Sequence, residues 1–146
     1  MLTIRRDSDY AARILLYLAM HPPETCITAR EVARQKLIPP GLARSLLTRL
    51  AGAGLLVSRR GKGGGFYLGR SPAEISLLEV VEAIEGPVVL NICTEEPLEC
   101  PLMPQCPVHE AWVDARQRLR EHLGRITFEL LARRGAELNP PSGEVG

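Results

Sequence analysis

Residues 28–68, TAREVARQKLIPPGLARSLLTRLAGAGLLVSRRGKGGGFYL, decide the fold that this chain can adopt. The stretch opens with Thr28 and Glu31 at the spacing of a capping box, in which each side chain accepts a hydrogen bond from a backbone N–H at the helix start. This pattern predicts a helix over residues 29–36. After a proline-rich turn, a second helix is expected over residues 41–51. Two short helices joined by a tight turn indicate a helix-turn-helix, with a plain helical hairpin as the alternative.

The two faces of the second predicted helix differ in polarity. Leucines recur at helical spacing on one face, which is therefore expected to point into the core: Leu42, Leu46 and Leu50. The opposite face is polar and basic. In a helix-turn-helix, that outer face lies in the major groove of DNA. The residues predicted to contact DNA from the two helices are Thr28, Arg44, Ser45, Thr48 and Arg49.

A β-hairpin is expected directly after these helices. Residues 55–58 and 66–68 have the composition of strands, and the turn between them is rich in glycine and carries Arg59, Arg60 and Lys62. Glycine lets the backbone approach phosphates closely, and arginine can enter a narrow minor groove. The glycines do not fit a nucleotide-binding phosphate loop, because the segment joins strand to strand. The fold class predicted is mostly α with a small β-wing, and the three basic residues are further DNA contacts.

Helical patterns flank this head on both sides. Residues 2–20 contain an amphipathic helix that Asp7 or Ser8 can cap. Downstream of the wing, Ser76 and Glu79 form a second capping box at the start of a short helix.

The longest helical pattern begins at residue 108. Its apolar residues step by three and four positions: Val108, Trp112, Ala115, Leu119, Leu123, Ile126 and Leu130. Little of the chain remains to cover this stripe, so a second copy of the chain is the simplest partner. Alternatively the helix packs on the first helix of its own chain, and both can hold. The expected organisation is a winged head at 1–87, a cysteine-rich loop at 88–107, a dimerisation helix at 108–134 and a disordered tail at 135–146.

The loop between the head and this helix contains three of the four cysteines. Cys93, Cys100 and Cys106 are separated by six and then five residues, and His109 stands three positions after the last. The prolines in the loop exclude a helix or a paired strand. Clustered thiolates on such a loop suit an iron–sulfur cluster, zinc or Cu(I). Cys26 lies elsewhere and is expected to be a half-buried structural residue.

Three chemistries remain open for the cysteine loop. The spacing favours an iron–sulfur cluster over zinc, because structural zinc sites pair their cysteines more closely, although three cysteines and a histidine are also a zinc set. Oxidisable thiols are the third. A disulfide scaffold is not expected, because the chain begins without a secretory signal and a cytoplasmic protein keeps its thiols reduced.

Composition narrows the classes of partner. The formal net charge is only +1, so contact with DNA must come from a local basic cluster. No apolar run approaches the roughly 18 residues of a membrane helix, so no membrane partner is expected. No substrate-binding motif is present, so neither an enzyme nor a small-molecule substrate is expected.

Taken in order, these elements resemble the Rrf family of bacterial winged-helix regulators over residues 1 to about 133. The most specific matches are residues 8–11, the wing at 60–66, residues 76–86 and the cysteines. The resemblance implies a homodimer that is held by the C-terminal helices and binds a near-palindromic double-stranded DNA operator. It further implies a transcriptional repressor whose operator binding is controlled by an iron–sulfur cluster that senses nitric oxide, iron or redox state. A zinc- or thiol-based regulator without a cluster is the alternative.

The same resemblance implies the cluster ligands. Cysteines matching Cys93, Cys100 and Cys106 hold a 2Fe–2S or 4Fe–4S cluster in the family, and the first gap here is one residue longer than in IscR-like members. The fourth ligand in IscR-like members is a histidine where His109 stands. In NsrR-like members it is an acidic residue of the other subunit, where Asp9 stands. Closeness in sequence and the preference of iron for imidazole favour His109.

Overall fold

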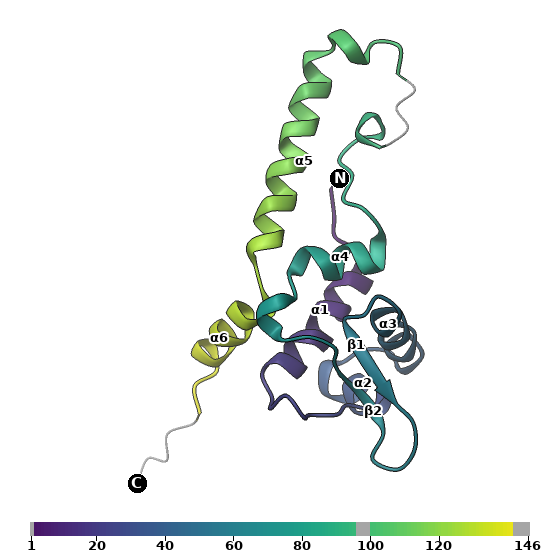
Figure 1. Ribbon diagram of the computed structural model, residues 1–146, viewed down its shortest axis with the longest axis vertical. Coiled ribbons are helices and arrows are strands. Elements are labelled where there is room, and N and C mark those ends of the chain that lie inside the picture. Colours follow the sequence, from purple (N-terminus) through teal and green to yellow (C-terminus); the bar gives the residue numbers. More distant parts are fainter. Residues whose placement is uncertain (1, 96–99, 142–146) are drawn as a thin grey trace.

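In the computed structural model, residues 2–95 and 100–141 are described, and they form six α-helices and one two-stranded antiparallel sheet. Figure 1 shows the wing hairpin at one end of the long axis and the cysteine loop at the other, with α5 extending between the head and that loop. The elements are α1 (Arg6–Ala19), α2 (Ala29–Lys36), α3 (Pro40–Gly52), β1 (Leu56–Arg59), β2 (Gly65–Leu68), α4 (Leu77–Glu85), α5 (Pro107–Arg125) and α6 (Phe128–Leu138). Short 3-10 turns are η1 (Pro72–Glu74), η2 (Ile92–Thr94) and η3 (Met103–Gln105). The predicted fold class, mostly α with a small β-wing, is confirmed.

Both predicted capping boxes are present. The Thr28 hydroxyl accepts a hydrogen bond from the backbone N–H of Glu31 at 3.2 Å, and the Glu31 carboxylate accepts one from the N–H of Thr28 at 2.8 Å. Ser76 and Glu79 repeat the arrangement at 3.2 and 3.0 Å. The hydrogen bonds from Thr28 hold the pKa of Glu31 below its ordinary value. These boxes fix where α2 and α4 begin.

The core lies where α1, α3 and α4 pack together. Leucine side chains from α3 enter it as expected at positions 46 and 50, but Leu42 is only partly covered and Ala43 takes the fully buried position instead. Ile14 and Leu15 of α1 meet them, both without solvent exposure. Burying an aliphatic side chain of this size contributes about 1.5–3 kcal/mol, so this cluster supplies much of the stability of the head.

The expected cap of the first helix is wrong. The N-cap residue of α1 is Arg5, and no side chain next to it in sequence provides the cap. Ser8 is instead buried inside the first turn, and its hydroxyl donates to the Glu85 carboxylate at 2.5 Å. The same carboxylate oxygen accepts a hydrogen bond from the Arg5 N–H at 2.7 Å. A residue of α4 therefore caps α1.

Residues 108–134 were expected to form one helix, and the structure divides them into α5 and α6. The backbone becomes extended at Ile126, where its carbonyl accepts a hydrogen bond from the N–H of Leu77 at 2.8 Å. Thr127 then caps α6, accepting a hydrogen bond from the N–H of Leu130 at 3.3 Å. Phe128 follows and is completely buried. A long-range bridge to the segment before α4 interrupts the helix, although the apolar periodicity runs through the break.

The C-terminal helix packs on α1, so the second interpretation of the apolar stripe is correct for its last part. Gly135 lies against the Met20 side chain, where an added Cβ would meet the sulfur at 2.9 Å. The tail predicted from residue 135 is helical as far as Leu138, and residues 142–146 lie outside the described residues, as do residues 96–99 of the predicted loop. None of the helices in the described residues combines the length and the apolar content of a membrane-spanning segment.

Candidate cysteine and DNA-binding sites

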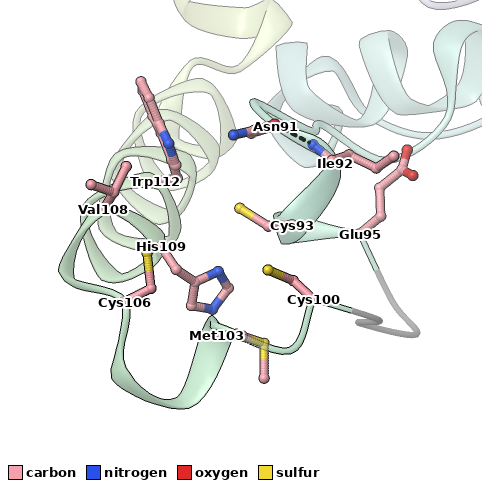
Figure 2. A pocket seen from close by; sticks show the side chains of 10 residues that line it. All are labelled: Asn91, Ile92, Cys93, Glu95, Cys100, Met103, Cys106, Val108, His109 and Trp112. Carbon is pink, nitrogen blue, oxygen red and sulfur yellow. Dashed lines mark hydrogen bonds between the residues drawn. The ribbon is translucent and has the colours of Figure 1, made fainter.

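The three loop cysteines and His109 line one cavity of about 650 Å³. Figure 2 shows the thiols of Cys93 and Cys100 pointing into the same space, with the His109 imidazole beside Cys100 and the Cys106 thiol next to the start of α5. Within residues 2–95 and 100–141, no three His, Cys, Asp or Glu side chains converge closely enough to hold a single metal ion. The fold thus brings the predicted ligand set to one cavity, without the tight convergence of a mononuclear site.

Local turns position each of these donors. Cys93 lies in η2, which Asn91 and Thr94 hold together: the Thr94 hydroxyl donates to the Asn91 carbonyl at 2.7 Å, and the Asn91 side chain accepts the Ile92 N–H at 2.7 Å. Cys106 is the N-cap residue of α5, and Pro107 occupies the first helical position, where its fixed φ suits a helix start. His109 consequently lies in the first turn of α5.

His109 has a polar atom that nothing in the described chain satisfies. Its Nδ1 is buried and has no hydrogen-bond partner among those residues. An unpaired buried polar atom is unfavourable, so its presence at a cavity wall indicates a site for a ligand. Three thiols with an imidazole are a donor set for an iron–sulfur cluster and also for zinc. The residues present therefore fit the group that the family resemblance implies.

Asp9, the other candidate ligand, is not at the cavity of its own chain. It lies on α1, with its side chain 54% exposed, and its carboxylate pairs with Arg13 at 2.6 Å. Within one chain, the structure brings His109 and not Asp9 to the cysteines.

The predicted DNA contacts on α3 are mostly open to solvent. Arg44, Ser45 and Thr48 are exposed on its outer face, and the Thr48 hydroxyl donates to the Arg44 carbonyl at 3.0 Å. Arg49 is exposed as well, but its guanidinium also donates to the Ile84 carbonyl in the last turn of α4. That contact joins α3 to α4, and a DNA contact from Arg49 stays a prediction.

Basic residues that the sequence reasoning missed lie on α2. Arg30 and Arg34 are exposed one turn apart, and with Arg44 they line a shallow cavity of about 450 Å³ between α2 and α3. Their spacing of four positions in an exposed helix was the available signal. In a helix-turn-helix, the first helix crosses the DNA backbone, which suits such residues.

The wing is a four-residue antiparallel ladder in which Arg59 pairs with Gly65. Arg59, Arg60 and Lys62 are exposed, as Thr28 is at the start of α2. The Arg59 guanidinium lies over the Tyr67 ring at 4.9 Å from its centroid, so this side chain is held along the hairpin.

The base of the wing is joined to the segment before α2. The N–H of Ile27 donates to the Phe66 carbonyl at 2.9 Å, and the N–H of Phe66 donates back at 2.8 Å. Cys26 is half-buried at this junction, as expected, and its thiol beside the Tyr67 phenol raises the pKa of Tyr67. Gly65 is required there, because an added Cβ would lie 2.5 Å from the Cys26 sulfur.

Known proteins match the chain over most of its length. The Rrf2 family, described as an iron-dependent transcriptional regulator, matches residues 4–134. The HTH-type transcriptional regulator IscR of Xenorhabdus nematophila is 31% identical over 124 residues, which cover 85% of this chain and 75% of that protein.

Solved structures of CymR share the fold. The CymR of B. subtilis, named the global cysteine regulator of that organism, matches with a TM-score of 0.74 and 28% identity, covering 92% of this chain and 98% of that one. The oxidized form of Staphylococcus aureus CymR matches with a TM-score of 0.70 and 25% identity, covering 90% and 96%. The winged head, the cysteine cavity and these relatives lead to one assignment: the chain belongs to the Rrf2 family of transcriptional regulators, which bind DNA and are not enzymes.

Proposed function

We propose that this regulator binds its operator as a homodimer and that an iron–sulfur cluster held by Cys93, Cys100, Cys106 and His109 controls that binding. One observation carries the proposal: three thiols and a half-buried imidazole, whose buried Nδ1 has no partner among the described residues, line the same cavity. The relationship to IscR at 31% identity supports the choice of iron–sulfur over zinc. When bound, the cluster supplies iron that reacts with nitric oxide, oxygen or chelators and is lost when iron is scarce.

The protein's own residues orient the site. Pro107 starts α5 at a defined position, and this aims His109 at the cavity from a rigid helix. The η2 turn presents Cys93 from the opposite side (Figure 2). The loop's proline content limits the conformations that these thiols can adopt before anything binds, which lowers the entropy lost on binding.

A second copy of the chain is the proposed partner of α5. No residue of α5 is buried in the single chain. Three large apolar side chains near its start are among those exposed: 57% of the surface of Val108, 38% of Trp112 and 43% of Val113. A helix end with this much apolar surface is expected to be covered by another helix. Dimerisation would also allow Asp9 of one chain to approach the cavity of the other, as the resemblance implies for some members.

In the proposed complex with DNA, α3 contacts the bases of the operator and the wing contacts the DNA backbone. Arg44 and Ser45 face outward on α3 and are proposed to contact base edges in the major groove, while Arg60 and Lys62 contact phosphates or the minor groove. Arg44→Ala should weaken operator binding by about 1–3 kcal/mol and relax the preference at one base pair. If Arg44→Ala bound every sequence like the parent, α3 would not be the reading helix.

Lys62→Ala should weaken binding to operator DNA and to random DNA equally, and it should reduce the slope of log affinity against log salt concentration by about one.

The decisive experiment is anaerobic purification followed by absorption and Mössbauer spectroscopy, with operator binding measured before and after cluster removal. Replacing any one of Cys93, Cys100 or Cys106 by Ala should abolish stable cluster binding, because each supplies one of few anionic ligands. Cys26→Ala is the matched control and should retain the full spectrum. A colourless parent protein containing stoichiometric zinc would replace this proposal with the zinc alternative.

The fourth ligand is tested by a pair of variants. His109→Ala should change the absorption spectrum of the reconstituted protein, and Asp9→Ala should not, because Asp9 is already paired with Arg13 outside the cavity. The reverse result would assign the ligand to Asp9 of the partner subunit.

A thiol-based regulator is the second candidate, and the position of Cys26 favours it. This half-buried thiol lies at the base of the wing against Gly65 and Tyr67, so a group added to its sulfur would lie next to the hairpin. The relative solved in an oxidized form shares this fold at 25% identity. Under this candidate, peroxide treatment of a colourless parent protein weakens operator binding, and Cys26→Ser removes the effect.

A further inference from the structure

Arg116 of α5 fastens the segment that carries Cys93. Its Nε donates to the Val88 carbonyl at 2.7 Å, and its Nη1 donates to the Thr94 carbonyl at 3.3 Å. These two carbonyls lie at the two ends of the short stretch that leads from α4 into η2. The planar guanidinium is suited to this task, because its donors diverge in a fixed geometry and can bridge two acceptors.

The same stretch is also fastened to α4. The N–H of Val88 donates to the Glu82 carboxylate at 3.2 Å, so the peptide groups on both sides of Val88 are held. Glu82 in turn pairs with Arg120, one helical turn beyond Arg116 on α5. The side chains of Arg120 and Glu82 are only 30% and 26% exposed, so solvent screens this pair less than the exposed pairs elsewhere on α5.

We infer that Arg116 is a positioning residue for the cysteine site: it holds the turn bearing Cys93 against the helix that bears His109. Glu82, paired with Arg120, ties the segment that leads into that turn to α4. The inference rests on the proposed function for the identity of the ligand but not for the contacts themselves. Cys93 and His109 belong to segments joined by a long loop. His109 is part of α5, and Arg116 attaches the Cys93 turn to the same helix, so α5 fixes the position of both residues.

This arrangement links the cysteine cavity to the DNA-reading helix through α4. The last turn of α4 accepts the guanidinium of Arg49, which belongs to α3. The contacts therefore connect the segment that carries Cys93 to α4 through Glu82, and α4 to α3 through Arg49. Every step is a hydrogen bond or an ion pair within one subunit, so the route requires no contact from the partner.

The test compares Arg116→Ala and Arg116→Lys with Arg118→Ala. Arg118 is on the same helix but pairs with Asp114 and is 78% exposed, so it serves as the control for general loss of charge. In the metal-free, reduced protein, iodoacetamide alkylation of each cysteine is followed by peptide mass spectrometry. Arg116→Ala should accelerate alkylation of Cys93 by about fivefold or more, because two hydrogen bonds to a charged group are lost. Cys26 should keep the parent rate.

Arg116→Lys keeps the charge but has no planar fork, so it should fall between the parent and Arg116→Ala. A second measurement follows the visible absorbance of the anaerobically reconstituted proteins after addition of a chelator. Cluster loss should be faster in Arg116→Ala than in Arg118→Ala, and equal in Arg118→Ala and the parent.

Equal Cys93 alkylation rates in the parent, Arg116→Ala and Arg118→Ala would overturn the inference. So would faster alkylation at Cys26 to the same extent as at Cys93, because that would show general unfolding instead of a released turn. A parent protein that takes up no cluster would contradict the proposed function alone, since the alkylation measurement in metal-free protein still decides the role of Arg116.

Discussion

The winged head (α1 to α4, the wing and α6) and the arm (the cysteine loop with η2 and η3, and α5) are stabilised by different forces. In the head, α1 to α4 and α6 bury apolar side chains, and Ile14, Leu46 and Phe128 have no exposed surface. In the arm, no α5 residue is buried, and polar contacts such as Arg116 with Val88 hold the adjoining segment. Figure 1 shows α5 extending from the head along the long axis to the cysteine loop at the far end.

This difference bears on the position of Cys93, Cys100 and Cys106, which lie in the arm, whereas Cys26 lies in the head. The head is held by close apolar packing, and packed interiors have low compressibility. Hydrogen-bonded segments with little buried surface have lower local stability, and elements that respond to ligands come from that part of a protein. We therefore expect local opening to cost less free energy in the arm than in the head.

The largest effect is expected at the junction of the two regions, where Phe128 anchors α6 to the core. Phe128→Ala should destabilise the head by about 3–5 kcal/mol, because a fully buried ring is replaced by a cavity. Chemical denaturation followed by circular dichroism measures this. Leu130→Ala, on the same helix but 47% exposed, should cost much less. Equal losses would mean that α6 is not part of the head.

A smaller effect is expected at the base of the wing. In Gly65→Ala the new Cβ would lie 2.7 Å from the Ile27 carbonyl oxygen as well as against Cys26, and overpacking of this kind costs about 1–3 kcal/mol. Gly63→Ala meets no atom within 4 Å and carries only the strain of a φ of +77°, about 1 kcal/mol. Thermal unfolding and operator affinity should both rank Gly65→Ala as the more damaging change. The opposite ranking would show that the wing is not packed on the Ile27 segment.

Loss of a capping side chain is expected to affect the head and the arm differently. Ser76→Ala removes the cap of α4 and should lower the free energy of unfolding by about 1 kcal/mol. Asn91→Ala removes the side chain that closes η2 and should leave global unfolding within about 0.5 kcal/mol, because η2 is outside the core. Hydrogen exchange at Ile92 and Cys93 should nevertheless become faster. A global loss as large as that of Ser76→Ala would mean that the arm and the head unfold together.

The smallest effect is the pH dependence of the head. Partial burial raises the pKa of Glu79, but hydrogen bonds from Ser76 and the pairing with Arg70 outweigh it, so the pKa lies below 4.5. The unfolded chain therefore binds a proton more readily, and the stability from Glu79 is present above pH 4.5 and lost as the pH falls through the lower folded pKa. Glu79→Gln should reduce the fall in melting temperature over that acid range. An unchanged profile would assign the acid sensitivity to other carboxylates.

Features that depend on neighbouring residues could be predicted from the sequence alone. The capping boxes at Thr28 and Ser76, the two helices between them and the glycine-rich wing each need only residues within a few positions, and all are present. The candidate metal ligands Cys93, Cys100, Cys106 and His109 could likewise be listed from the sequence, because the type and spacing of these residues limit which metals they can bind. These features were enough for the fold class and for the family.

Contacts between distant residues were decided by the tertiary structure. Glu85 caps α1 from 77 positions beyond Ser8, and Arg49 donates to a carbonyl 35 positions away, so no local pattern indicated either. The break at Ile126 was hidden because an apolar step of three or four positions is the same whether the helix continues or restarts. The packing of Phe128 decided it, since burying an aromatic ring and pairing the backbone with the segment before α4 outweigh the few helical hydrogen bonds that the break removes.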